Sequence, residues 1–187
     1  SRALLQHLAE SDLGRDMFPF GTVQNVMIAG APVRVLRISF VGELGYELHV
    51  PTEYLLTVFD ALHDVGIEHD LVNAGYRAID SLRLEKQFCA WGAEIGPDHS
   101  LLEAGLGFAA DPNKIDFVGR DAVYAQRSAP LKKKLATFTI TGDQPLLGGE
   151  TIYRDGEVVG WITSGGFAHS FVCPVGLGHV RREQGVD

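Results

Sequence analysis

The first fifty residues carry the pattern of a short helix followed by β-strands. Leu4, Leu5 and Leu8 recur at helical spacing, and the polar Ser11–Asp12 region ends this helix. Runs of β-branched and aromatic residues, or of alternating apolar and polar residues, then predict three strands, at 22–28, 33–40 and 46–50. The first two strands are joined at 29–32 by a link of hairpin length and composition, which indicates an antiparallel sheet.

The period changes to that of α-helices after this sheet. Apolar residues between Leu55 and Val65 lie on one face of an amphipathic helix, which Thr52 is expected to cap and Gly66 to end. A second helix is predicted at about 74–85. Its expected inward-facing residues are Ile79 and Leu82.

The second half of the chain is predicted to be mainly β-structure. Residues 91–116 mix Gly, Pro, Asp and Ser with short apolar runs, which indicates loops, a short helix and a strand near 106–109. The lysines at 132–134 mark a change of composition and are interpreted as a linker. Beyond them we expect strands at 135–140, 151–153, 158–163 and 175–180, with tight turns at 155–156 and 163–166. Short strands with glycine-rich turns are typical of a small antiparallel barrel or sandwich.

Composition places the chain among ordinary globular proteins. Its 187 residues allow one compact domain or two small ones, and 45% hydrophobic with 21% charged residues disfavour a disordered or fibrous chain. A net charge of −8 offers no basic surface for nucleic acid. No apolar run approaches the roughly 18 residues of a membrane span. Because the chain opens on Ser1 within a helical pattern, we expect it to be a piece of a longer protein.

Cysteine and histidine spacing does not indicate a metal site or a thiol nucleophile. Cys89 and Cys173 lie far apart, so neither a disulfide framework nor a cysteine zinc site is expected, and a reducing compartment fits. The 7 histidines form no HxH or HExxH pattern. The glycine-rich run at 105–110 lacks the strand and helix context of a dinucleotide site.

Two charged residues are candidates for ligand binding. A carboxylate fixed on a strand, such as Glu47, can accept two parallel N–H bonds from an amino-amide edge like that of a pterin, although a solvated strand face explains it as well. Arg77 stands in the first turn of its predicted helix, where a cation opposes the helix dipole. It could bind a ligand carboxylate or Glu47, or pair with Asp80 or Glu85 on the helix surface.

Several motifs together carry a resemblance to a known family. The main ones are Gly42–Leu48 (GELGYEL) and Arg77–Lys86 (RAIDSLRLEK). Shorter matches lie at 91–92, 102–106, 117–120 and 160–166. With these motifs in this order the chain resembles the aminomethyltransferase family, which includes the T-protein of the glycine cleavage system and the folate domains of dimethylglycine and sarcosine dehydrogenases. The segment 84–91 and Pro97–Asp98 are more similar to the dehydrogenase-linked branch.

The resemblance implies an α+β fold with two domains. A folate-binding domain with an antiparallel sheet is expected at 1–130, lacking its N-terminal part, and a truncated β-barrel domain at 131–187. In the family, the glutamate of the first motif and the arginine that opens the second contact folate. They correspond to Glu47 and Arg77, with Tyr46 as a further cofactor-binding residue. The catalytic residue stays unassigned, because the family's acidic residue near folate N10 is expected upstream of Ser1.

The resemblance also implies a reaction and its cofactors. A one-carbon unit, from an oxidised methyl group or from the aminomethyl arm of a lipoyl carrier, is captured by tetrahydrofolate to give 5,10-methylenetetrahydrofolate. FAD is expected only in a missing N-terminal domain, if the protein is a dehydrogenase. The expected partners are a small amine or a lipoyl carrier protein, without metal, nucleic acid or membrane, in the cytoplasm or alternatively the mitochondrial matrix.

Two alternatives to this function remain open at the level of sequence. One is a non-catalytic scaffold or interaction domain of the same fold, which would not bind folate. The other is a demethylase-type relative that takes a methyl group from another donor, such as a sulfonium or an aryl ether. For the 187-residue chain by itself, we expect weak or absent catalysis.

Overall fold

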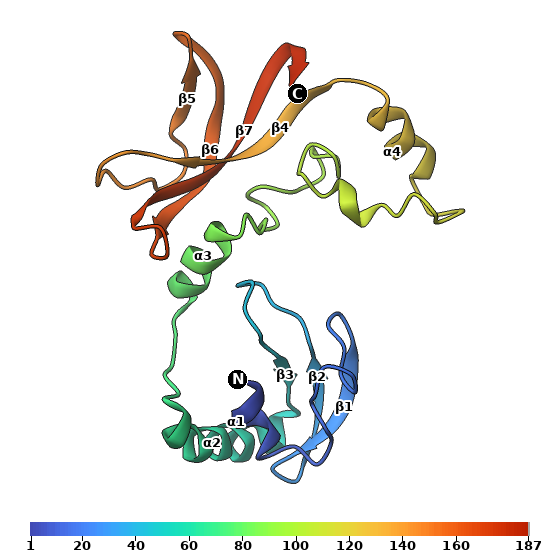
Figure 1. Ribbon diagram of the computed structural model, residues 1–187, viewed down its shortest axis with the longest axis vertical. Helices are drawn as coiled ribbons and strands as arrows, with labels where there is room; N and C mark the ends of the chain where they lie inside the picture. Colours follow the sequence, from blue (N-terminus) through green and yellow to red (C-terminus); the bar gives the residue numbers. More distant parts are fainter. Residues whose placement is uncertain (187) are drawn as a thin grey trace. The chain divides into compact units, whose positions relative to one another are not determined.

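The computed structural model describes residues 1–186 and contains two compact units, Ser1–Tyr76 and Arg77–Asp187. In Figure 1 the first unit runs from blue to green and the second from green to red. Both combine helices with antiparallel strands, which confirms the expected α+β class. The expected domain boundary between 1–130 and 131–187 stays a prediction, because compact units do not define functional domains.

The first unit is a three-stranded antiparallel sheet with helices packed on it. The sheet order is β1-β2-β3, and the elements are α1 (Arg2–Gln6), β1 (Val23–Ile28), β2 (Ala31–Leu36), β3 (Glu47–His49), η1 (Thr52–Tyr54), α2 (Leu55–Gly66) and η2 (Ile67–His69). The predicted hairpin link is only two residues long, because Ile28 pairs with Ala31. Ala29 and Gly30 form this turn with φ of 49° and 75°, as a tight hairpin turn with two positive φ angles requires.

The core of the first unit is apolar. Leucines of α1 and of the following loop pack on the inward faces of β1 and β2, together with one face of α2. The fully or nearly fully buried side chains are Leu5, Leu13, Phe18, Val26, Ile28, Ala31, Val33, Val35 and Val58. The alternation of buried and exposed residues along β2 explains why the sequence pattern predicted this strand.

Two expectations for the first unit need correction. The second strand ends at Leu36 and not at residue 40, because the backbone leaves the ladder after Val23 pairs with Leu36. Thr52 does not cap α2, since it lies in the preceding 3₁₀ turn and makes no capping hydrogen bond. Gly66 does end α2, and a Cβ at this position would lie 2.7 Å from the Cβ of Leu71.

The second unit consists of a four-stranded antiparallel sheet with two α-helices. Its sheet order is β4-β7-β6-β5, and the elements are α3 (Tyr76–Glu85), η3 (Gly107–Ala109), α4 (Arg120–Arg127), β4 (Leu131–Thr139), β5 (Thr151–Arg154), β6 (Glu157–Ala168) and β7 (Cys173–Val186). Hydrogen bonds among the described strands do not close this sheet into a complete barrel. Asp155 and Gly156, with φ of 53° and 86°, form the predicted tight turn between β5 and β6.

Several expectations for the second unit were wrong. The lysines at 132–134 are part of β4 and not a linker. The predicted turn at 163–166 lies inside β6, because these residues pair with β7 after a β-bulge at Ile162. Glycine is needed there, since a Cβ at Gly165 would overlap the carbonyl of Leu146. Residues 107–109 form a 3₁₀ turn and not a strand, and α4 was not predicted.

The orientation of α3 also differs from the prediction. Ile79 is half-buried as expected, but Leu82 is exposed. The side chains that α3 buries completely are those of Arg83 and Leu84. The hydrophobic pattern could not show this, because a buried arginine occupies a position that an apolar residue would normally take.

Candidate functional site

Glu47 lies at the surface of β3. Its side chain is 53% exposed, and its carboxylate lies 3.7 Å from the imidazole of His49 on the same face of the strand. Tyr46 is held internally: its hydroxyl donates to the carbonyl of Leu13 at 3.1 Å and lies 3.3 Å from Nε of Arg2. The hydroxyl of Tyr46 is therefore already engaged, and its ring lies 5.8 Å from that of the buried Phe18.

Arg77 is exposed in the first turn of α3, as the sequence predicted. The surface pair that the sequence suggested with Asp80 does not form, because Asp80 binds Nε of Arg83 at 3.2 Å instead. Among the residues that the structure describes, none makes a hydrogen bond or ion pair with the Arg77 guanidinium. Glu47 belongs to the first compact unit and Arg77 to the second, so their pairing stays a prediction.

Sequence reasoning missed a buried polar network in the second unit. Nη1 of Arg83 donates to Oε2 of Glu94 at 2.9 Å, and the two side chains are only 4% and 0% exposed. Nη2 of Arg83 donates to the hydroxyl of Ser164 at 2.9 Å. The hydroxyl of Thr163 donates to Oε1 of Glu94 at 2.7 Å, and the backbone carbonyl of Glu94 lies 2.8 Å from Nε2 of His179.

This network keeps Glu94 ionised. Burial alone would raise the pKa of Glu94, but hydrogen bonds from Ser164, Thr163 and the amide of Ala90, with the charge of Arg83, hold this pKa below its ordinary value. The pKa of Cys89 is raised, first by burial and then by the charge of Glu94, which does not fit a reactive thiolate.

His179 is neutral for a related reason. Burial is the main cause that lowers its pKa, and the nearby His99 and Lys133 act in the same direction. Because Nε2 lies at the carbonyl of Glu94, it carries the proton, and Nδ1 is buried without a hydrogen-bond partner among the described residues. The ring of His99 stacks on that of His179 at 4.3 Å, and its Nδ1 is also buried and unpaired.

One signal could have pointed to the network. Arg83 lies within the RAIDSLRLEK motif, and an arginine in the middle of a helix between two leucines indicates a buried charge with a specific partner. The partners themselves are 11 and 81 residues away, so no local pattern identifies Glu94 or Ser164.

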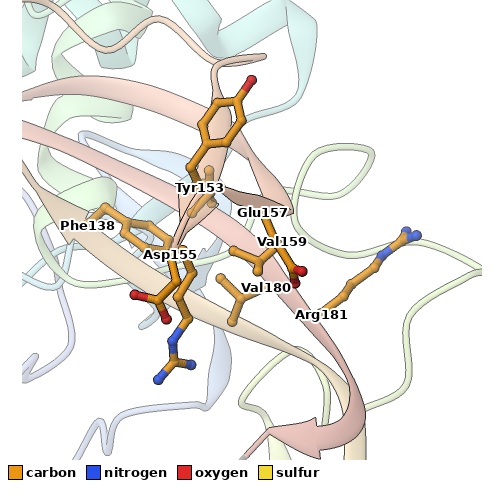
Figure 2. A pocket seen from close by; sticks show the side chains of 9 residues that line it. Phe138, Tyr153, Asp155, Glu157, Val159, Val180 and Arg181 are labelled. Atoms are coloured by element: carbon orange, nitrogen blue, oxygen red, sulfur yellow. The ribbon is translucent and has the colours of Figure 1, made fainter.

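Surface cavities in the described part of the chain lie elsewhere. Figure 2 shows the larger, of about 410 Å³, whose apolar wall includes Phe138, Val159 and Val180, with Asp155 and Glu157 at its edge. The smaller, of about 320 Å³, includes His49 and Arg34. Neither is lined by Tyr46, Glu47 or Arg77.

The described residues offer neither a metal-ligand cluster nor a membrane-spanning helix. The described residues contain no group of three or more His, Cys, Asp and Glu side chains arranged to hold a metal ion. No helix in the described part of the chain has the length and apolar character needed to cross a membrane.

Two family models match the chain in consecutive order. The GCVT N-terminal domain matches residues 1–114, and the glycine cleavage T-protein C-terminal barrel domain matches residues 133–186. The crystal structure of glycine cleavage system aminomethyltransferase T from Bartonella henselae is similar with a TM-score of 0.81 and 26% identity, over 96% of this chain and 48% of that one.

Similar sequences include both dehydrogenases and aminomethyltransferases. Mitochondrial sarcosine dehydrogenase of Mus musculus is 44% identical over 99% of this chain and 20% of its own length. Mitochondrial dimethylglycine dehydrogenase of Homo sapiens is 37% identical over 96% of this chain and 21% of its own length. The aminomethyltransferase of Caldanaerobacter subterraneus subsp. tengcongensis is 34% identical over 93% of this chain and 46% of its own length.

The chain thus spans about a fifth of these dehydrogenases and somewhat under half of this aminomethyltransferase. The match extends over nearly the whole chain and includes both the α+β region and the barrel strands. These similarities confirm the resemblance that the GELGYEL and RAIDSLRLEK motifs indicated. The chain belongs to the GCVT family of glycine cleavage T-protein domains.

Proposed function

We propose that the chain is a tetrahydrofolate-binding, one-carbon transfer domain of a larger protein, most similar to a flavin-linked sarcosine or dimethylglycine dehydrogenase. The observation that supports this most is the ordered match of both family models along one chain. The greater identity to the two dehydrogenases favours that branch over a separate T-protein. FAD would then be held by another domain.

The chemistry of Glu47 fits the pterin end of tetrahydrofolate. The 2-amino and ring N–H groups of a pterin form a pair of parallel donors, and a carboxylate accepts such a pair with both oxygens. Glu47 is exposed, and the one side chain described near its carboxylate is that of His49 at 3.7 Å, so both oxygens can reach a ligand. Tyr46 offers no such free group, because its hydroxyl contacts Leu13 and Arg2.

The chemistry of Arg77 fits a carboxylate, such as those of the glutamate tail of folate. A guanidinium binds a carboxylate with two parallel hydrogen bonds. A cation in the first turn of a helix costs a few tenths of a kcal/mol, and α3 has no acidic residue in that turn to offset it. A bound carboxylate would remove this cost.

The cofactor supplies the nucleophilic nitrogens that capture the one-carbon unit. The residues of this chain would bind and orient it: Glu47 fixes the ring, and Arg77 fixes the tail. Holding two reactants in position can contribute several kcal/mol to lowering a barrier. The one-carbon unit would come from the oxidised methyl group of a methylated glycine in the dehydrogenase form, or from the aminomethyl arm of a lipoyl carrier in the T-protein form.

We place the full-length protein in the mitochondrial matrix. The two dehydrogenase relatives carry "mitochondrial" in their names, which favours this alternative. These relatives give no support to the expectation of a cytoplasmic protein.

Calorimetric titration of the full-length protein with tetrahydrofolate tests this function. We expect saturable binding, weakened about tenfold or more by Glu47→Gln and by Arg77→Ala, because each change removes a charge-assisted hydrogen bond of about 1.5–3 kcal/mol. Matched controls are Glu53→Gln, an exposed carboxylate of the same unit, and Arg120→Ala, an exposed arginine in the first turn of α4. Both controls should bind as the wild type does.

The outcomes separate the alternatives. Absence of tetrahydrofolate binding would contradict the proposal and favour a scaffold domain. Binding that neither Glu47→Gln nor Arg77→Ala weakens would leave the folate function and reject these residues. Turnover of a sulfonium or aryl-ether donor, without turnover of sarcosine, dimethylglycine or a glycine-loaded lipoyl carrier, would favour the demethylase-type relative.

A further inference from the structure

The attachment of α3 within the second unit is uneven along the helix. Its first residues, Tyr76, Arg77 and Ala78, are exposed. Its second half is held by four consecutive or near-consecutive side chains. Ser81 donates to the carbonyl of Phe167 at 2.5 Å, Arg83 enters the buried network, Leu84 enters the apolar core, and Glu85 accepts from the amide of Ser170 at 3.0 Å.

Arg83 connects more elements than any of the other three side chains. Its Nε binds Asp80 on α3, its Nη1 binds Glu94 and the carbonyl of Phe88 at 3.2 Å, and its Nη2 binds Ser164 on β6. The planar fork of a guanidinium can satisfy these acceptors together, whereas the single ammonium of lysine cannot. Arg83 therefore fixes both the position and the direction of α3 relative to β6.

The position of Arg77 depends on that direction. Arg77 precedes Arg83 by six residues, which is about 9 Å along a helix. A tilt of about 10° at Arg83 would move the backbone of Arg77 by about 1.5 Å. Displacements of about 1 Å are enough to weaken an oriented hydrogen-bonded contact strongly.

We propose that Arg83, held by Glu94 and Ser164, is a positioning residue that sets the affinity for folate by orienting the helix that carries Arg77. The inference rests on the proposed function, because it takes Arg77 as a ligand contact. It also gives the buried ion pair a role. Buried ion pairs often add little net stability compared with apolar residues, so their presence is better explained by the geometry that they impose.

A double-mutant cycle on the full-length protein tests this. Binding of tetrahydrofolate is measured for the wild type, Arg83→Lys, Arg77→Ala and the double variant. We expect Arg83→Lys to raise the Kd about tenfold in the wild-type background and less than about twofold when Arg77 is already absent, because residues that act through one another are not additive. A merely structural role would weaken binding equally in both backgrounds.

Two further variants keep the test decisive. Ser164→Ala removes one acceptor of Arg83 and leaves the charges intact, so it should raise the Kd about threefold while lowering the unfolding midpoint only modestly, even if Arg83→Lys does not fold. Arg127→Lys is the matched control, because Arg127 holds α4 through the carbonyls of Gly107 and Ala110. It should leave the Kd unchanged.

Each result has one meaning. Additive effects of Arg83→Lys and Arg77→Ala, or an unchanged Kd in Ser164→Ala, would overturn this inference and leave the proposed function standing. A rise of the Kd in Arg127→Lys as large as in Arg83→Lys would also overturn it. Absence of tetrahydrofolate binding by the wild type would overturn the proposed function, and this inference with it.

Discussion

The two units of the molecule bury different kinds of side chain. The first is built on a cluster of nine buried apolar residues, and its buried Arg37 donates to the carbonyl of Phe18. The second has a smaller apolar cluster, made of Leu84, Leu135, Ala168, Val175 and Leu177. Beside it the second unit buries Arg83, Glu94 and His179.

This difference predicts different sensitivities. Apolar burial is non-directional and changes little with pH. The stability of the first unit should therefore depend mainly on the side-chain volume that a substitution removes from its core. The second unit depends on hydrogen bonds with fixed directions and on the charge states of Glu94 and His179. Its stability should respond to changes that leave the apolar cluster intact.

The largest expected effect comes from Glu94→Ala in the 187-residue chain. Removing this carboxylate leaves Arg83 buried without its charge partner, which should lower the free energy of unfolding by about 3–5 kcal/mol. Both tryptophans, Trp91 and Trp161, belong to the second unit, so urea unfolding followed by tryptophan fluorescence reports on that unit.

The matched change in the first unit is Leu13→Ala. Leu13 is completely buried in the apolar cluster, so its truncation should cost about 3 kcal/mol. If the two units unfold independently, Leu13→Ala should leave the tryptophan-detected urea midpoint unchanged. A loss below about 1 kcal/mol in Glu94→Ala would contradict the comparison, because the buried pair would then be dispensable.

A smaller effect is expected from mild acid in the second unit. The pKa of His179 is lowered in the folded chain, so below its ordinary value of 6.5 the unfolded state takes up a proton that the folded state does not. Stability of the second unit should therefore fall as the pH drops from 7 through 6.5 towards 5.5. The measurement is the tryptophan-detected urea midpoint at each pH.

Glutamine is the informative replacement for this histidine. His179→Gln keeps an N–H donor for the carbonyl of Glu94 but does not titrate. The difference between the urea midpoints at pH 7 and pH 5.5 should therefore become smaller. His69→Gln, at an exposed histidine of the first unit, should leave that difference unchanged. An unchanged difference in His179→Gln would show that other groups cause the acid sensitivity.

The smallest expected effect concerns side-chain hydrogen bonds at the start of α2 in the first unit and at the start of the turn at 101–105 in the second. Thr52 makes no capping hydrogen bond, so Thr52→Ala should change stability by less than about 0.5 kcal/mol. Ser100 in the second unit is different, because its hydroxyl accepts from the amide of Glu103 at 3.2 Å while Oε2 of Glu103 accepts from the amide of Ser100 at 3.0 Å. Ser100→Ala should cost about 1 kcal/mol. Equal costs in thermal unfolding would contradict this assignment.

Local patterns predicted the elements whose shape depends on neighbouring residues. The alternation along β2 and the turns at Ala29–Gly30 and Asp155–Gly156 were visible in the sequence. The apolar face predicted for α2 was only partly correct, because Val58 and Leu62 pack on the core while Leu55, Leu56 and Phe59 are exposed. The exposed positions of Glu47 and Arg77 agree with the binding roles that the family resemblance implied, although those roles stay predictions.

Patterns failed where distant residues decide the structure. The glycines at 165 and 166 resemble a turn, but they are small because β6 passes close to the backbone of Leu146 and the side chain of Leu84. The network around Glu94 depends on Arg83, Thr163 and His179, which come from three separate elements. Only the folded chain brings these groups together.

The lysines of β4 have a consequence for how the chain behaves in concentrated solution. Among the described strands, β4 and β5 are the edges of the four-stranded sheet, and unpaired edges can recruit a strand from another molecule. On β4 the carbonyl of Glu103 occupies the amide of Leu135, and three lysines precede it at 132–134. β5 is only four residues long. Charge and loop cover on one edge, and shortness on the other, oppose aggregation through the sheet.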